Sequence, residues 1–228
     1  LMRCAQDKEH FNFITSLFAT STFFTDVLAN KPEFLDWIMK NGRIHREKSL
    51  DEYREELEAY TNPESDYEKR RTLLCEYKRR EYLRIGIRDL LERGRIEEYC
   101  HELTNLAEAV CRFAYQECIE KTVRGYGKPK PETAADEEDG DVSFCIIAMG
   151  KFGGRELNFS SDIDLNFVYK EEGQTTGILT KSGLRHNSVT NLEFYSQLAF
   201  TISNYINEPT EQGMIFRVDT RLRPEGRA

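Results

Sequence analysis

The sequence lacks any run of about 18 consecutive apolar residues, the length that a membrane-spanning helix requires. Its first residues also become charged before the apolar segment of a signal peptide could form. Neither a membrane-spanning helix nor a signal peptide is therefore expected in these residues. We therefore expect a cytoplasmic protein without a membrane partner.

The sequence lacks a C-x-x-C pair among its six cysteines. Cys100, Cys111 and Cys118 are spaced by 11 and 7 residues, which places them on one face of a helix. We expect reduced thiols facing the core rather than disulfides or a zinc site. The four histidines likewise follow no metal-ligand spacing.

The chain has no excess of basic residues, because 32 Lys and Arg stand against 40 Asp and Glu for a net charge of −8. This balance argues against a nucleic-acid partner. One stretch, residues 69–95, is locally basic, with ten basic and four acidic side chains. Two interpretations of it are open: solvated helix faces, or a docking surface for a phosphate or an acidic partner, formed by Lys78, Arg79, Arg80, Arg84 and Arg88.

Apolar residues at helical spacing run through most of residues 1–125, which predicts a helical region. The stretches 65–91 and 96–123 predict two long helices joined by a short turn. Residues 126–141 carry two prolines and six acids, and we expect them to form an acidic flexible linker.

The pattern changes in residues 142–228. Short apolar runs predict strands at 143–149, 163–169 and 214–222, and residues 188–207 predict a helix with Ser188 as its N-cap. The fold class expected for the whole chain is therefore α+β.

Two carboxylates, Asp162 and Asp164, stand two residues apart at the start of the second predicted strand. Such side chains project to the same face, and crowded carboxylates repel unless a cation neutralises them. Mg²⁺ prefers oxygen ligands, and two ions about 4 Å apart can activate an attacking oxygen and steady a leaving one. The pair therefore predicts a magnesium site, with a structural role as the alternative.

Further site residues are expected around this pair. Asp219, in the last predicted strand, is the candidate for a third metal-binding and catalytic acid. Backbone amides, hydroxyls and cations could bind phosphate oxygens, and the candidates for this role are Gly153, Gly154, Ser160, Ser161, Lys151, Arg155, Arg221 and Arg223.

The sequence does not match three other motifs that bind phosphate or metal ions. An EF-hand starting at Asp162 needs Gly at its sixth position, where Phe167 stands, and Glu at its twelfth, where Gly173 stands. A Walker A loop needs Ser or Thr after Gly-Lys, but Phe152 follows Lys151. A G-x-G-x-x-G is also absent.

Two ordered motifs carry a family resemblance. The string MGKFGGRELNFSSDIDLNFVY (149–169), followed by FRVDTRLRPEGR (216–227), closely resembles the glutamine synthetase adenylyltransferase family. The segment LRIGIRDL (83–90) is similar to that family's helical region. Family members are several times longer, so we expect this chain to be a fragment of the N-terminal half.

The resemblance implies a nucleotidyltransferase core of the DNA polymerase β type with a mixed sheet, in which Asp162, Asp164 and Asp219 match the metal-binding acids. One half of the family enzyme removes AMP from a tyrosine of glutamine synthetase by phosphorolysis, releasing ADP. The other half attaches AMP from ATP. Arg217, two residues before Asp219, favours the removing half.

The resemblance also implies the PII signal protein and glutamine as regulators in nitrogen metabolism. Two alternatives remain open. One is a catalytically incomplete regulatory or nucleotide-binding module, and the other is a nucleotidyltransferase that acts on another substrate.

Overall fold

The computed structural model describes residues 15, 17–19, 21–91, 94–132, 143–181 and 183–220. Its elements in chain order are α2 Thr22–Asn30, α3 Glu33–Met39, the 3₁₀ helix η2 Lys40–His45, α4 Leu50–Thr61, α5 Tyr67–Leu90, α6 Ile96–Tyr126, β1 Pro129–Pro131, β2 Phe144–Met149, α7 Gly150–Gly153, β3 Ile163–Tyr169, β4 Gly173–Thr175, β5 Ile178–Leu179, β6 Arg185–His186, α8 Asn191–Asn207 and β7 Val218–Asp219. This mixture confirms the α+β class. No helix within the described residues is long and apolar enough to cross a membrane.

The long helices are confirmed close to the predicted bounds. Asp66 caps α5 by accepting a hydrogen bond from the Lys69 amide, and Ser49 and Glu52 form a capping box at the start of α4. The predicted cap of α8 was wrong, because Thr190 and Glu193, not Ser188, form the capping box there.

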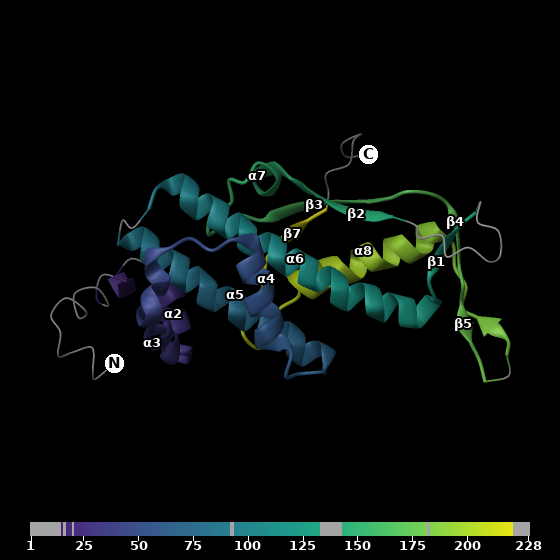
Figure 1. The fold of residues 1–228 in the computed structure, drawn as a ribbon, viewed down its shortest axis with the longest axis horizontal. Coiled ribbons are helices and arrows are strands. Elements are labelled where there is room, and N and C mark those ends of the chain that lie inside the picture. Colours follow the sequence, from purple (N-terminus) through teal and green to yellow (C-terminus); the bar gives the residue numbers. More distant parts are fainter. Residues whose placement is uncertain are drawn as a thin grey trace.

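Three strands form the central sheet in the order β2-β3-β7. β2 and β3 are antiparallel, whereas β3 and β7 are parallel, so the sheet is mixed. The last strand is shorter than predicted within the described residues, since only residues 218 and 219 pair. Figure 1 shows the long helices α5, α6 and α8 on one side of this sheet.

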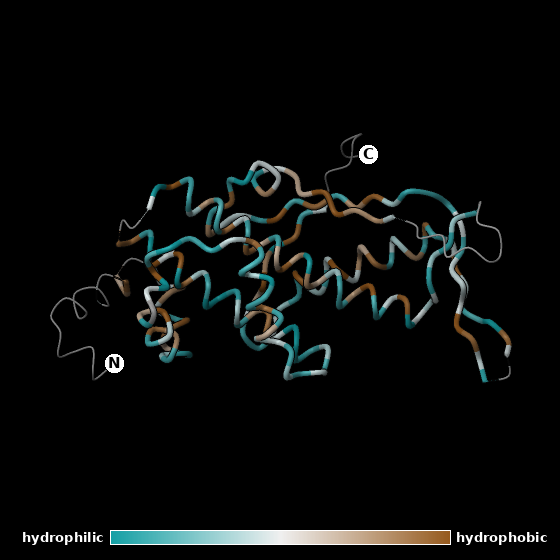
Figure 2. The backbone as a smooth tube through the Cα atoms, in the orientation of Figure 1, coloured by the Kyte–Doolittle hydropathy of each residue, from teal (hydrophilic) through white to brown (hydrophobic). Residues whose placement is uncertain are grey.

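One large hydrophobic core joins the helices to the sheet. It holds residues of α4, α5 and α6 together with Ile163 and Leu165 of β3 and Phe194 and Leu198 of α8. Hydrophobic residues recur along the inner sides of these helices and on β2 and β3 (Figure 2). Phe144 of β2 stacks on Tyr195 of α8 with ring centroids 5.1 Å apart. A smaller core packs α2 and α3 against α5.

The segment expected to be a flexible linker contains structure. α6 continues to Tyr126, and β1 pairs with β4 in an antiparallel register. Pairing satisfies backbone groups that a solvated linker would leave to water. Residues 133–142 of the linker lie outside the described part.

The basic stretch 69–95 is neither a solvated face nor a single docking surface. Arg84 is fully buried, and Arg88 and Lys78 are also buried. Arg84 and Arg88 both pair with the buried Glu102 of α6, and Arg84 also pairs with Glu81 at 2.7 Å. Charge counts along one helix could not show this, because Glu102, the acid that both arginines share, lies on another helix.

Candidate functional site

The sheet brings two of the predicted acids together. In the parallel ladder between β3 and β7, Asp164 is the register partner of Asp219. Asp162 lies immediately before β3, and the Ile163 amide donates a hydrogen bond to the Arg217 carbonyl at 2.9 Å. Because register partners in a sheet project to the same face, the two carboxylates lie on one side of it.

That side is the outer face of the sheet. Ile163 and Leu165 alternate with Asp164 and are buried against the helices. The register partner of Asp164 in β2 is Met149, which is 37% exposed. Val168, on the same face of β3 as Asp164, is 47% exposed. The acids therefore lie where a substrate could reach them.

The acids lie close enough together to affect the pKa of Asp164. Burial raises the pKa of Asp164, and the neighbouring charges of Asp219 and Asp162 raise it further. Asp162 forms an ion pair with Arg217, whose Nε lies 2.6 Å from its Oδ1. Asp162 is thus partly neutralised by Arg217, whereas the repulsion at Asp164 would be relieved by a cation.

The fit of a metal ion can be judged from this donor set. No three His, Cys, Asp or Glu side chains in the described parts of the chain are grouped closely enough to hold an ion as they stand. Asp164 and Asp219 offer hard oxygen ligands, and the charge of Asp219 raises the pKa of Asp164, which suits Mg²⁺. Asp162 would have to exchange Arg217 for the ion.

A glycine turn connects β2 to the acids. Gly150 has a φ of +52°, a conformation that side-chain-bearing residues rarely adopt, and a Cβ there would collide with Asp164 Oδ2. Gly153 lies against the Ala148 carbonyl, and the Gly154 amide donates to the Gly150 carbonyl at 2.9 Å. The predicted phosphate-side Gly154 amide is therefore used within the turn itself.

The two predicted serines lie in the loop before β3. Both hydroxyls donate to Oδ1 of Asn158 at 3.0 Å. The backbone amide of Asn158 in turn donates a hydrogen bond to the Ser161 hydroxyl at 3.1 Å. These bonds shape the loop, and Ser160 is exposed at its surface.

The predicted cations separate from one another. Lys151 is exposed on α7. Arg155 has a φ of +59° and donates from Nη2 to Asn105 Oδ1 of α6 at 2.6 Å, which ties the glycine turn to the helices. Arg221 and Arg223 lie outside the described residues.

Sequence reasoning assigned no site role to Gly150, Asn158 or Asn105. Gly150 directly follows the predicted strand 143–149, and that position was a usable signal. No sequence pattern relates Asn105 to Arg155, because 50 residues separate them.

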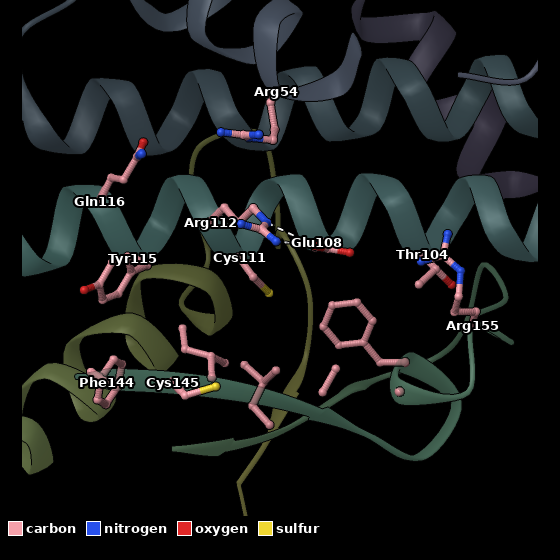
Figure 3. A pocket seen from close by; sticks show the side chains of 15 residues that line it. Arg54, Thr104, Glu108, Cys111, Arg112, Tyr115, Gln116, Phe144, Cys145 and Arg155 are labelled. Atoms are coloured by element: carbon pink, nitrogen blue, oxygen red, sulfur yellow. Dashed lines mark hydrogen bonds and ion pairs between the residues drawn. The ribbon is translucent and has the colours of Figure 1, made fainter. Parts of the chain in front are cut away.

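A cavity of about 660 Å³ lies on the other side of β2, between this strand and α6. Figure 3 shows Arg112 and Glu108 of α6 on one wall of the cavity, and Phe144 and Cys145 of β2 on the opposite wall. Gly153 and Arg155 are the only predicted site residues among its described lining. Since the acids face the outer side of the sheet, this cavity is separate from them.

Comparison with known proteins gives a consistent result. The family model of glutamate-ammonia ligase adenylyltransferase matches residues 11–228. The chain is 33% identical over 215 residues to the bifunctional glutamine synthetase adenylyltransferase/adenylyl-removing enzyme of Shewanella loihica, covering 93% of this chain and 21% of that protein. It is 32% identical over 219 residues to the enzyme of that name from Nitrosomonas eutropha, covering 94% and 22%. The chain thus spans about a fifth of the length of the curated relatives it matches.

Proposed function

Because the chain belongs to the glutamate-ammonia ligase adenylyltransferase family, we propose that it is part of an enzyme that controls glutamine synthetase by adenylyl transfer on a tyrosine. The reaction we assign to it is the removing one. Inorganic phosphate attacks the AMP phosphorus, the bond from phosphorus to the tyrosine oxygen breaks, and ADP and unmodified tyrosine are the products.

The observation that carries this proposal is the parallel pairing of Asp164 with Asp219, with Asp162 two residues before Asp164. Carboxylates from two neighbouring strands on an exposed sheet face could hold metal ions next to the phosphorus atom that reacts. We further propose that the strands and α8 are part of a nucleotidyltransferase core of the DNA polymerase β type.

Mg²⁺ is the cofactor that we propose for Asp162, Asp164 and Asp219, and when bound it would neutralise charge on the phosphate oxygens. The chain's own residues have other tasks. Ser160, two residues before Asp162, carries an exposed hydroxyl that could donate to a phosphate oxygen in place of Asn158. Arg217 would stabilise a phosphate oxygen once its guanidinium leaves Asp162. No protein nucleophile is required, because phosphate is the attacking group.

Other parts of the assignment follow from the family and are proposals as well. They are a cytoplasmic location, ATP or ADP as the nucleotide, and regulation by the PII protein and glutamine. Their basis is the family membership alone.

The proposal is tested with adenylylated glutamine synthetase, phosphate and Mg²⁺. We expect Asp164→Asn and Asp219→Asn to lower ADP release at least about 100-fold, as the loss of a group that stabilises transition-state charge typically does. Asp26→Asn, on the exposed surface of α2, is the matched control and should retain activity. Full activity of Asp164→Asn would refute the site assignment.

The direction of transfer has its own test. The same protein is given ATP and unmodified glutamine synthetase. Incorporation of AMP in place of ADP release would assign the chain to the adenylylating reaction instead.

A nucleotide-binding module without turnover is the second candidate. The ion pair between Arg217 and Asp162 favours it, because it occupies one of the three acids. Metal-dependent nucleotide binding with neither ADP release nor AMP incorporation would support this candidate.

A further inference from the structure

A second cavity, of about 500 Å³, lies between α2, α5 and the loop that precedes β3. Its volume falls within the range of about 300–1,000 Å³ typical of small-molecule sites. Half of its lining residues are aromatic, and the lining consists of Ser21, Phe23, Phe24, Lys78, Tyr82, Asn158, Phe159 and Ser160. We call it the Lys78 pocket.

Lys78 is the one cation among these lining residues, and it is only 7% exposed. Its Nζ lies 3.6 Å from the ring centroid of Tyr82 and 4.7 Å from that of Phe216. Within the described residues the ammonium has ring contacts but neither a hydrogen-bond acceptor nor an ion-pair partner. Burial lowers its pKa to about 7. Burying a charged ammonium without an anionic partner costs free energy, and an anion bound beside it would offset that cost.

Aromatic rings that pack against one another form part of the remaining lining. Phe159 packs edge-on against both Tyr82 and Phe24, with centroids 5.5 and 5.9 Å apart. Such mutual contacts fix the rings before any ligand arrives, and fixed rings favour a planar aromatic ligand.

The pocket is distinct from the acids yet close to them along the chain. Ser160 lies two residues before Asp162, and Phe216, which contacts Lys78, lies three residues before Asp219. The acids face the outer side of the sheet, whereas Lys78 belongs to α5 on the helical side.

We propose that the Lys78 pocket binds a small planar aromatic molecule carrying a phosphate or carboxylate, whose anionic oxygens accept hydrogen bonds from the Lys78 ammonium. The aromatic part of the ligand packs on the rings of Phe24, Tyr82 and Phe159. This site goes beyond the proposed function, because it requires neither the acids nor a metal.

AMP is a suitable probe, since it joins a planar ring to a phosphate. Calorimetric titration is done in excess EDTA, so that the acids repel the phosphate and the Lys78 pocket alone attracts it. We expect Lys78→Met to weaken AMP binding at least tenfold and Lys78→Arg to retain it. Adenosine and inorganic phosphate, which each offer half of the ligand chemistry, should bind more weakly than AMP.

Lys121→Met is the matched control. Lys121 is exposed and its Nζ lies 3.9 Å from the Tyr67 ring centroid, so the variant removes a similar cation without touching the Lys78 pocket. Its AMP affinity should equal that of the original protein. Should Lys78→Met fail to fold, Phe159→Ala removes one wall of the pocket and should weaken AMP binding instead.

Three outcomes would overturn the proposal: no AMP binding by the original protein in EDTA, equal affinity of Lys78→Met, or loss of binding in Asp164→Asn but not in Lys78→Met. The last result would place AMP at the acids. It would leave the proposed function standing, so that the two proposals fail separately.

Discussion

At the scale of single residues, Gly150 decides how closely the end of β2 approaches Asp164. Its positive φ turns the chain immediately after the strand, and the space where a Cβ would stand is filled by the Asp164 carboxylate. The same carboxylate is the one whose pKa is raised by burial and by Asp219. The glycine and the acid therefore form one structural unit.

Gly150→Ala should lower both stability and activity. The left-handed conformation costs a non-glycine residue about 1–2 kcal/mol, and the new methyl group displaces Asp164. Urea unfolding would measure the first effect and ADP release the second. Gly125→Ala is the control, because Gly125 lies in α6 with open space at its Cβ position. That variant should be unchanged or stabilised by about 0.5–1 kcal/mol. Equal behaviour of the two variants would contradict the role of Gly150.

At the scale of elements, buried ion pairs connect α5, α6 and Lys48, which lies just before the cap of α4. Glu81 of α5 receives Lys48 and Arg84, and Glu102 of α6 receives Arg84 and Arg88. Although burial alone would raise the pKa of Glu81, the Arg84, Lys48 and Arg80 charges lower it to about 2. Removing one partner of such a network leaves an uncompensated charge in the interior.

The pH dependence of stability follows from Glu81. Its pKa in the folded protein, about 2, lies below its ordinary value of 4.5, so its stabilisation is complete above pH 4.5 and lost as the pH falls toward 2. Glu81→Gln should destabilise the protein by about 3–5 kcal/mol at pH 7 and flatten the decline between these two pH values. Urea unfolding over a pH series measures both.

Glu120→Gln is the control for this prediction. Glu120 pairs with Arg124 on the exposed surface of α6, and such pairs contribute little. A Glu81→Gln variant that matched this control at pH 7 would show that the buried network does not stabilise the fold.

At the scale of the whole molecule, the helical region and the sheet share one core. Phe152 after β2, Ile163 of β3 and Phe194 of α8 belong to the same buried cluster as the inner residues of α6. Separating residues 1–125 from residues 142–228 would expose this cluster on both pieces. Shared burial of this kind couples the unfolding of the parts.

We therefore expect one cooperative unfolding transition. Fluorescence of Trp37, the single tryptophan, reports on α3, and thiol labelling of the buried Cys111 reports on the main core. The two probes should give the same urea midpoint. An earlier Trp37 transition would mean that α2 and α3 unfold as a separate unit.

Much of the secondary structure could be predicted from local pattern. Helical spacing located α5 and α6, and short apolar runs located β2 and β3. The start of α8 and the pairing of β1 with β4 were not predicted. A helix cap and a short strand pairing depend on a few hydrogen bonds, whereas the prediction used the spacing of apolar residues.

The sequence by itself determined the α+β class, the spacing of Asp162 and Asp164, and the family resemblance, since each depends on residue order alone. Only the tertiary structure decided that Asp164 meets Asp219, that Arg217 pairs with Asp162, and that Lys78 lies buried in an aromatic pocket. Strand register and helix packing bring these groups together across long stretches of chain. Such contacts arise from the burial of a shared core, which no local pattern records.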